Sequence, residues 1–290
     1  SGAKNAALPL MIASLLTDET LTLANVPRLS DVSALSRILS NHGVDRSIAG
    51  KRVGQTSETG QTFALTARQI VDTCAPYELV STMRASFWVI APILARMGEA
   101  KVSLPGGCAI GTRPVDLLLM ALERLGAKID IENGYALARA PKGLKGGDIV
   151  FPKVTVGGTH TALMAAVLAD GVTTIENAAR EPEVVDLADC LNKMGAKIEG
   201  AGTATITIRG VGRLGGTHHA VLPDRIETGT YAMAVAMTGG DVLLEGARAD
   251  LLQAALDVMV EAGVEVSTSN EGIRIRRNGA ALEPVDVTTD

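Results

Sequence analysis

A cysteine and an arginine lie on a glycine-rich segment between a predicted strand and a predicted helix. Val102–Leu104 reads as a short strand, and Pro105-Gly106-Gly107 cannot continue it, so the chain must turn there. Cys108 follows on that loop, and Arg113-Pro114-Val115-Asp116 then opens a helix whose leucines recur at helical spacing. An arginine side chain and unpaired backbone amides meet at this helix start, which favours an anionic ligand.

Spacing alone leaves the role of Cys108 open. A single cysteine is often a small buried apolar residue, and glycine-rich loops are common, so the pattern is compatible with packing as well as with reactivity. A thiol with the ordinary pKa of about 8.5 is mostly protonated near neutral pH and can serve as a general acid.

The string Pro105–Gly111 followed by Arg113–Leu117 resembles the active-site loop of the UDP-N-acetylglucosamine 1-carboxyvinyltransferase family, a branch of the enolpyruvyl transferases. The resemblance covers nearly all of the chain. It implies enolpyruvyl transfer from phosphoenolpyruvate to the 3-hydroxyl of UDP-N-acetylglucosamine with release of phosphate, the first committed step of peptidoglycan synthesis, which supports cell shape and division. It also implies that Cys108 is the proton donor, forms a covalent adduct as a nucleophile, or does both, and that fosfomycin targets it.

Two further cationic residues lie at predicted helices. Lys4-Asn5 precedes an apolar helix, where a solvated lysine is the plain interpretation, although an ammonium beside free amides also suits a phosphate. Arg84 lies in a largely apolar segment, where an unpaired guanidinium is costly, so it needs an anionic partner, either a carboxylate or a ligand. The resemblance implies that Lys4 and Asn5 contact phosphoenolpyruvate and that Arg84 faces the nucleotide sugar.

Two segments resemble the family's nucleotide-binding strings. The first segment is Arg113–Leu117, in which Asp116 has a plain interpretation as a helix-start residue. The second segment starts at Lys153 and reads as a strand, a turn at Gly157-Gly158 and a helix start. This geometry also suits an anion. The resemblance implies phosphoenolpyruvate contacts at Lys4, Asn5 and Arg113. It implies UDP-N-acetylglucosamine contacts at Arg84, Arg113, Pro114, Val115, Asp116, Leu117, Lys153, Val154, Thr155 and Val156.

Composition limits the classes of partner. The 290 residues carry a net charge of -5 and only 2% aromatic residues, which disfavours nucleic acid and anionic membranes as ligands. The three cysteines are too scattered for a disulfide scaffold, and the four histidines lack metal-ligand spacing. We therefore expect a cytoplasmic protein with no metal, no cofactor, no membrane segment and no obligate protein partner, whose substrates are the two small molecules.

One pattern recurs four times along the chain. Each copy reads as a helix rich in small residues, then a strand, a helix, a glycine, and two strands. The closing glycines Gly43, Gly126, Gly195 and Gly263 are separated by 83, 69 and 68 residues, and the longer first interval predicts a hairpin insertion over residues 46–61. The first helices are predicted over residues 5–16, 79–97, 159–169 and 226–237.

The repeat predicts an α/β (mixed α+β) fold with an inside-out arrangement. The strands at 128–132, 205–209 and 273–276 alternate apolar and polar residues, so each has one solvated face. The helices at 159–169 and 226–237 are apolar or small nearly all round, as buried helices are. We expect an inside-out α/β barrel of helix-strand-helix-strand-strand units with buried helices and outer sheets, which is also the fold that the resemblance implies.

The resemblance further implies two domains of three units each, whereas this sequence holds four units. We expect a first domain at residues 1–222 with three units, which carries the nucleotide-sugar site and the lid loop at residues 105–111, and a partial second domain at 223–290 with one unit. The chain is thus expected to be truncated, to lack the family's general base, and to be weakly active or inactive alone.

Alternatives remain within and outside the fold. A shikimate-pathway enolpyruvyl transferase would use the same donor, but the resemblance implies that it lacks Cys108 and the string after Arg113. An RNA-phosphate cyclase relative would need a histidine nucleophile and a more basic surface. A non-catalytic binding domain that keeps the fold is the third possibility.

Overall fold

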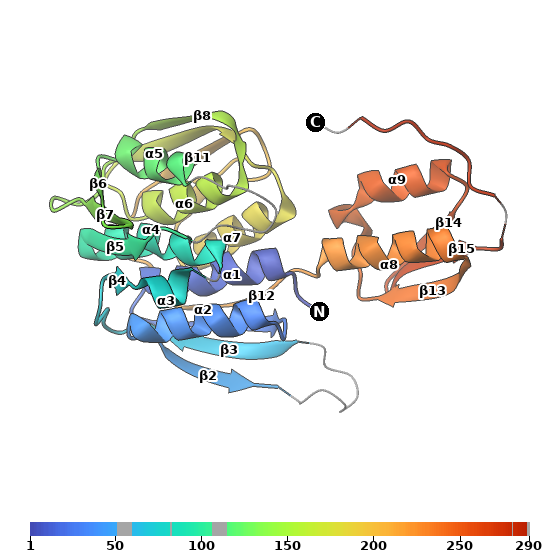
Figure 1. The fold of residues 1–290 in the computed structure, drawn as a ribbon, viewed down its shortest axis with the longest axis horizontal. Coiled ribbons are helices and arrows are strands. Elements are labelled where there is room, and N and C mark those ends of the chain that lie inside the picture. The colour runs from blue at the N-terminus through green and yellow to red at the C-terminus, as the bar shows by residue number, and fades with distance from the viewer. Residues whose placement is uncertain (51–59, 82, 106–114, 280, 289–290) are drawn as a thin grey trace. The chain divides into compact units, whose positions relative to one another are not determined.

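The computed structural model describes residues 1–50, 60–81, 83–105, 115–279 and 281–288 (Figure 1). Its contacts divide the chain into two compact units. The larger comprises Gly2–Leu222, and the smaller comprises Ser1 with Pro223–Asp290. The predicted Cys108, Arg113 and Pro114 lie outside the described residues, as does most of the predicted hairpin insertion.

The larger unit holds three copies of the predicted repeat, and their order of elements confirms the prediction. The first contains α1 (Lys4–Ala13), the 3-10 helix η1 (Ser14–Leu16), β1 (Thr20–Val26), α2 (Ser30–Asn41), β2 (Asp45–Ala49) and β3 (Gln61–Thr66). The second contains α3 (Tyr77–Val80), the 3-10 helix η2 (Arg84–Val89), α4 (Ile90–Met97), β5 (Glu99–Ser103), α5 (Asp116–Arg124), β6 (Lys128–Glu132) and β7 (Tyr135–Arg139). The third contains α6 (Val156–Ala166), β9 (Val172–Ala178), α7 (Pro182–Lys193), β10 (Lys197–Glu199) and β11 (Thr205–Arg209).

The smaller unit holds the fourth copy. It contains α8 (Arg225–Thr238), β13 (Gly240–Glu245), the 3-10 helix η3 (Ala249–Leu251), α9 (Gln253–Glu261), β14 (Glu265–Ser269) and β15 (Gly272–Arg277). These three strands form one antiparallel sheet in the order β13-β15-β14.

The same backbone motif ends the second helix of every copy. The glycines Gly43, Gly126, Gly195 and Gly263 all have left-handed φ values, between 87° and 104°. The amide after each glycine donates to a carbonyl five residues earlier, as in Val44 to Leu39 at 3.0 Å and Val264 to Met259 at 2.9 Å. This motif explains the glycine period in the sequence.

Each sheet of the larger unit has a fourth, parallel strand at one edge. These strands are β4 (Cys74–Ala75) beside β5, β8 (Asp148–Thr155) beside β9, and β12 (Thr217–Ala220) beside β1. The end of the unit therefore pairs with its beginning. Two left-handed asparagines mark equivalent points, since Asn25 Nδ2 donates to the Val221 carbonyl at 2.9 Å and Asn177 Nδ2 donates to the Phe151 carbonyl at 2.7 Å.

A polar network, in which His219 and Asp186 are buried and Lys193 is exposed, holds β12 on α7. The ammonium of Lys193 lies 3.0 Å from His219 Nδ1, and His219 Nε2 lies 2.9 Å from Asp186 Oδ1. Because an ammonium can only donate, Nδ1 accepts and Nε2 donates to the carboxylate. Asp186 also accepts from the Leu222 amide, so this network fixes the segment with which the unit closes.

The helices α1, α4 and α6 form the interior, with the sheets outside, as predicted. From Ala6 to Leu16 every side chain is buried, and residues 158–166 of α6 are buried as well. The strand β11 alternates exposed and buried residues, with Ile206 and Ile208 facing the core. The three sheets remain separate and do not close into one barrel. At the edge strand β6 the predicted alternation fails, because Ile131 is exposed.

Two expectations about inner helices were wrong. The predicted helix at 79–97 is divided into α3, η2 and α4, with Met83 in an extended conformation before η2; Pro92 is tolerated because it lies in the first turn of α4. The helix α8 was expected to be buried, but Tyr231 and Met237 are 61% and 75% exposed. Within its own unit α8 packs only on one side, against α9, β13 and β15, whereas α6 has helices on several sides.

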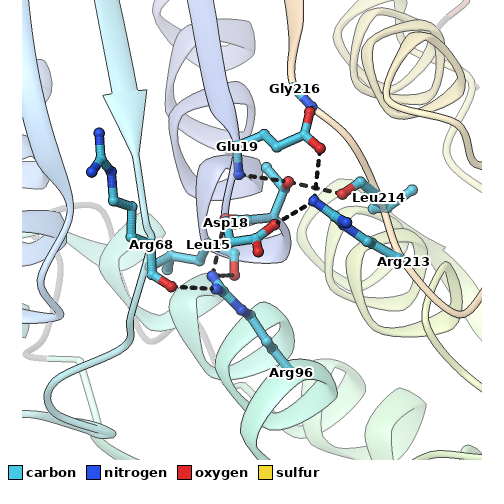
Figure 2. Close-up of polar contacts among 9 residues, drawn as sticks. Leu15, Asp18, Glu19, Arg68, Arg96, Arg213, Leu214 and Gly216 are labelled. Carbon is cyan, nitrogen blue, oxygen red and sulfur yellow. Dashed lines mark hydrogen bonds and ion pairs between the residues drawn. The ribbon is translucent and has the colours of Figure 1, made fainter.

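A polar cluster ties together the ends of the first inner helices (Figure 2). The guanidinium of Arg96 donates to the carbonyls of Leu15, Thr17 and Arg68 at 3.0 to 3.2 Å. Arg213 binds Asp18 and Glu19, and Glu19 also accepts from the Gly216 amide at 2.8 Å. These contacts satisfy carbonyls in and just after η1.

Candidate active site

The described site residues lie at or next to the starts of four helices. Lys4 and Asn5 are the first residues of α1, and Arg84 is the first residue of η2. Asp116 and Leu117 begin α5 after Val115, and Val156 begins α6 after Lys153, Val154 and Thr155 of β8. Backbone amides at helix starts lack intrahelical acceptors, so this arrangement suits substrates that carry phosphate and carboxylate groups.

Lys4 is held by a carboxylate from a neighbouring helix. Its Nζ lies 3.3 Å from Asp31 Oδ2 in the first turn of α2, and both side chains are partly exposed. Asn5 is exposed beside it. The structure therefore places a cation and an amide at the surface-facing start of an otherwise buried helix, where a small anion can reach both.

The start of α6 is capped by the residue that the sequence pattern identified. Thr155 Oγ1 accepts from the Gly158 amide at 3.2 Å, and the Thr155 carbonyl accepts from the Thr159 hydroxyl at 2.8 Å. The strand β8 passes directly into α6 without the intervening turn that the two glycines predicted. Lys153 and Val154 are exposed, so their side chains are accessible to a ligand.

The start of α5 presents one polar and one apolar residue. Asp116 is exposed and Val115 is half-buried, whereas Leu117 faces the interior with 9% exposure. Among the residues that the structure describes, no side chain caps this helix start. Asp116 is accessible for a hydrogen bond to a ligand, and Leu117 contributes by packing.

Sequence reasoning missed Trp88, which packs against the start of α6. A Cβ added to Gly157 would lie 3.2 Å from Trp88 Nε1 and 3.6 Å from Leu118 Cδ1. Trp88 is the fifth residue of η2, and its indole lies against the start of α6, where Leu118 of α5 also packs. As the single tryptophan of the chain, it was the available sequence signal.

Burial controls the titratable groups near the interior. It lowers the pKa of His160 to about 4, an effect that the Glu183 backbone carbonyl only partly offsets. Burial raises the pKa of the Cys190 thiol to about 12 and also raises that of Cys74, so neither thiol is activated. Within the described ranges, no group of three or more His, Cys, Asp and Glu residues could hold a metal ion.

The described part of the chain also contains no helix with the length and apolar character needed to cross a bilayer.

Comparisons with known proteins identify the family. The EPSP synthase (3-phosphoshikimate 1-carboxyvinyltransferase) family matches residues 1–289. The UDP-N-acetylglucosamine 1-carboxyvinyltransferase of Methylobacterium nodulans is 73% identical over 290 residues, which is all of this chain and 68% of that protein. The protein of the same name from Beijerinckia indica subsp. indica is 73% identical over 289 residues, or 67% of its length.

Solved structures show the same fold. The enolpyruvyl transferase NikO from Streptomyces tendae superposes with a TM-score of 0.80 at 21% identity, covering 98% of this chain and 66% of that one. EPSP synthase from Acinetobacter baumannii gives a TM-score of 0.71 at 18% identity, covering 95% of this chain and 62% of that one. The chain thus spans about two thirds of its relatives, and it belongs to the enolpyruvyl transferase family, within which it groups with the UDP-N-acetylglucosamine 1-carboxyvinyltransferases.

Proposed function

We propose that this chain forms the nucleotide-sugar half of an enzyme that transfers the enolpyruvyl group of phosphoenolpyruvate to the 3-hydroxyl of UDP-N-acetylglucosamine. The observation that carries the proposal is that Trp88 and Leu118 both pack against Gly157, since this brings η2 and α5 to the start of α6, where the expected segment Lys153–Val156 ends. Curated relatives with 71% to 73% identity carry the name of this activity, which supports the same assignment.

The charge of the substrates explains the residue types. Both substrates are polyanions, whereas the chain has a net charge of -5, so binding needs local cations. Lys4 and Arg84 supply these at the helix starts of α1 and η2, and Arg113 supplies a third from outside the described residues. We assign Lys4, Asn5 and Arg113 to phosphoenolpyruvate, and Arg84, Arg113–Leu117 and Lys153–Val156 to the nucleotide sugar.

The proposed reaction is an addition followed by an elimination. The thiol of Cys108 donates a proton to carbon 3 of phosphoenolpyruvate while the sugar 3-hydroxyl oxygen attacks carbon 2 and loses its proton to a base, giving a tetrahedral ketal. Loss of a proton from carbon 3 then restores the double bond as the carbon–oxygen bond to phosphate breaks. A second route for the same thiol is addition across the double bond, in which sulfur bonds to carbon 2, the π bond breaks and carbon 3 takes up a proton in exchange for the proton lost by the thiol, giving a covalent adduct. Lys4, Arg84 and Arg113 stabilise the departing phosphate.

We further propose the cellular setting that this reaction implies. The product is a precursor of peptidoglycan, so the reaction belongs in the cytoplasm and supports cell wall formation and division. Its small-molecule partners are the two substrates, and the chemistry needs neither a metal nor an organic cofactor. Fosfomycin, an epoxide, would alkylate Cys108.

A shikimate acceptor is the closest alternative, because the matching family description and the Acinetobacter structures carry that name. Three observations favour the nucleotide sugar. The shikimate structures are only 18% identical, whereas the nucleotide-sugar relatives are more than 70% identical, and the chain carries both Cys108 and the Arg113–Leu117 string.

Isothermal titration calorimetry with UDP-N-acetylglucosamine tests the proposal. We expect saturable binding by the chain and its loss, by roughly tenfold or more, in Arg113→Ala. Arg209→Ala, which removes an exposed arginine at the end of β11, is the matched control and should bind like the parent chain. Binding of shikimate 3-phosphate in place of the nucleotide sugar, or no binding at all, would overturn the assignment.

A further inference from the structure

Trp88 lies near the end of η2 and packs against the start of α6. Its neighbours Phe87 and Val89 are completely buried, but Trp88 itself is only half-buried. The indole Nε1 would be 3.2 Å from a Cβ at Gly157, so the ring lies against the backbone of the first turn of α6. Leu118 Cδ1 of α5 would lie 3.6 Å from the same Cβ, so both side chains pack against Gly157.

The imidazole of His160 packs against the indole of Trp88. The two ring centroids are 5.1 Å apart and the planes cross at 65°, an edge-to-face arrangement that aromatic pairs favour. His160 is completely buried. Because burial lowers its pKa to about 4, the ring is uncharged near neutral pH and packs as an aromatic surface.

We propose that Trp88 is a positioning residue of the nucleotide-sugar site. Braced by His160, its indole fixes the spacing between the start of α5 and the start of α6, which carry the two expected nucleotide-binding segments. This inference rests on the proposed function. It also explains Gly157, because any side chain there would push the indole away from α6.

The first test adds one methyl group beneath the indole. Gly157 lies in α6 without a left-handed φ, so Gly157→Ala should maintain or raise the thermal unfolding midpoint through helix propensity. The new Cβ nevertheless forces Trp88 to shift. We expect the affinity for UDP-N-acetylglucosamine to fall roughly tenfold, as measured by calorimetry.

A second substitution separates positioning from direct obstruction. Trp88→Phe removes the part of the ring that carries Nε1, so the double variant has room for the new methyl group. We expect Gly157→Ala with Trp88→Phe to recover binding to within about threefold of Trp88→Phe alone. Gly229→Ala is the control for glycine replacement in a helix, since a Cβ there meets only Leu252 at an ordinary 3.9 Å.

The fluorescence of Trp88 reports on its local surroundings and does not depend on the overall stability of the fold. All tryptophan emission comes from Trp88, so saturation with UDP-N-acetylglucosamine should change its intensity with the same midpoint as the calorimetric titration. Free tryptophan amide mixed with the same nucleotide sugar corrects for absorption by uracil. His160→Ala, which removes the brace, should shift the emission of the free protein to longer wavelength and weaken binding, whereas His160→Phe should retain both properties.

The outcomes are distinguishable. If the parent chain fails to bind the nucleotide sugar, the proposed function is wrong and this inference falls with it. If the parent binds and Arg113→Ala does not, but Gly157→Ala binds normally and the emission of Trp88 is unaffected by ligand, the function stands and Trp88 has no positioning role. Failure of Trp88→Phe to rescue Gly157→Ala would likewise overturn the inference, since the methyl would then obstruct the ligand directly.

Discussion

The ammonium of Lys4 and the carboxylate of Asp31 form an ion pair of 3.3 Å that joins the start of α1 to the first turn of α2. The two residues lie in different elements, 27 positions apart in the chain. The pair therefore fixes where the proposed phosphate-binding cation points.

Asp31→Asn should weaken phosphoenolpyruvate binding more than it weakens the fold. The substitution removes the charge that orients Lys4, so we expect the affinity for phosphoenolpyruvate, measured in the presence of UDP-N-acetylglucosamine, to fall roughly threefold to tenfold. Since both side chains are partly exposed, the free energy of unfolding should change by less than about 1 kcal/mol.

Asp130→Asn provides the control for Asp31→Asn. It breaks another partly exposed ion pair, that of Asp130 with Arg139 at 3.0 Å in the sheet of the second repeat. Its phosphoenolpyruvate affinity should equal that of the parent chain. Equal losses in both variants would show that Asp31 has no specific role at Lys4.

His160 should make the fold less stable in mild acid. Its pKa is lowered to about 4 in the folded chain but is near 6.5 when unfolded, so only the unfolded state takes up the proton between these values. The stabilisation is therefore complete above pH 6.5 and is lost as the pH falls toward about 4, by up to about 1.4 kcal/mol per pH unit.

Urea denaturation of the parent and His160→Phe at several pH values measures this loss. The variant should lose less stability between pH 6.5 and about 4, while a smaller slope persists because burial also lowers the pKa of His42. His218→Phe replaces an exposed histidine and should keep the parent's slope. Identical slopes in the parent and His160→Phe would contradict the burial argument.

The Lys193–His219–Asp186 network should be important for stability. His219→Leu leaves a buried carboxylate without its imidazole donor, so we expect a loss of about 2 to 4 kcal/mol in the free energy of unfolding. The exposed neighbour gives the control, because His218→Leu should change this quantity by less than about 0.5 kcal/mol. A loss below 1 kcal/mol in His219→Leu would mean that β12 is held by other contacts.

Local features of the sequence predicted the repeat well. The glycine after each second helix adopts a left-handed φ in every copy, and alternating strands such as β11 show the expected single buried face. Both features depend on neighbouring residues, so a pattern in the sequence suffices. The predicted helix starts around Lys4 and Asp116 were likewise confirmed, whereas α6 begins at Val156, earlier than the predicted start at residue 159.

The sequence pattern did not predict contacts between segments that are far apart in the chain. The pairing of β12 with β1 joins residues nearly 200 positions apart, and the contact of Trp88 with His160 joins two repeats. The exposure of α8 shows the converse limit. Its apolar composition is that of a buried helix, but burial requires partners on several sides, and composition does not report whether they are present.

Reactivity of the three cysteines should differ sharply. Burial raises the pKa of Cys190 to about 12 and also raises that of Cys74, so both should resist alkylation in the folded chain. We expect a limited dose of iodoacetamide to modify Cys108 first, as peptide mass spectrometry would show. Preferential modification of Cys74 would argue against a reactive thiol at Cys108.

Intact-mass spectrometry after incubation with fosfomycin tests the central claim most directly, on this chain and on Cys108→Asp, with and without UDP-N-acetylglucosamine. The proposed function predicts a single adduct on Cys108 that the nucleotide sugar promotes and that Cys108→Asp lacks. An adduct that forms equally in both proteins, or one whose formation the nucleotide sugar does not affect despite saturable binding, would contradict the assignment of Cys108 to a shared site with the nucleotide sugar.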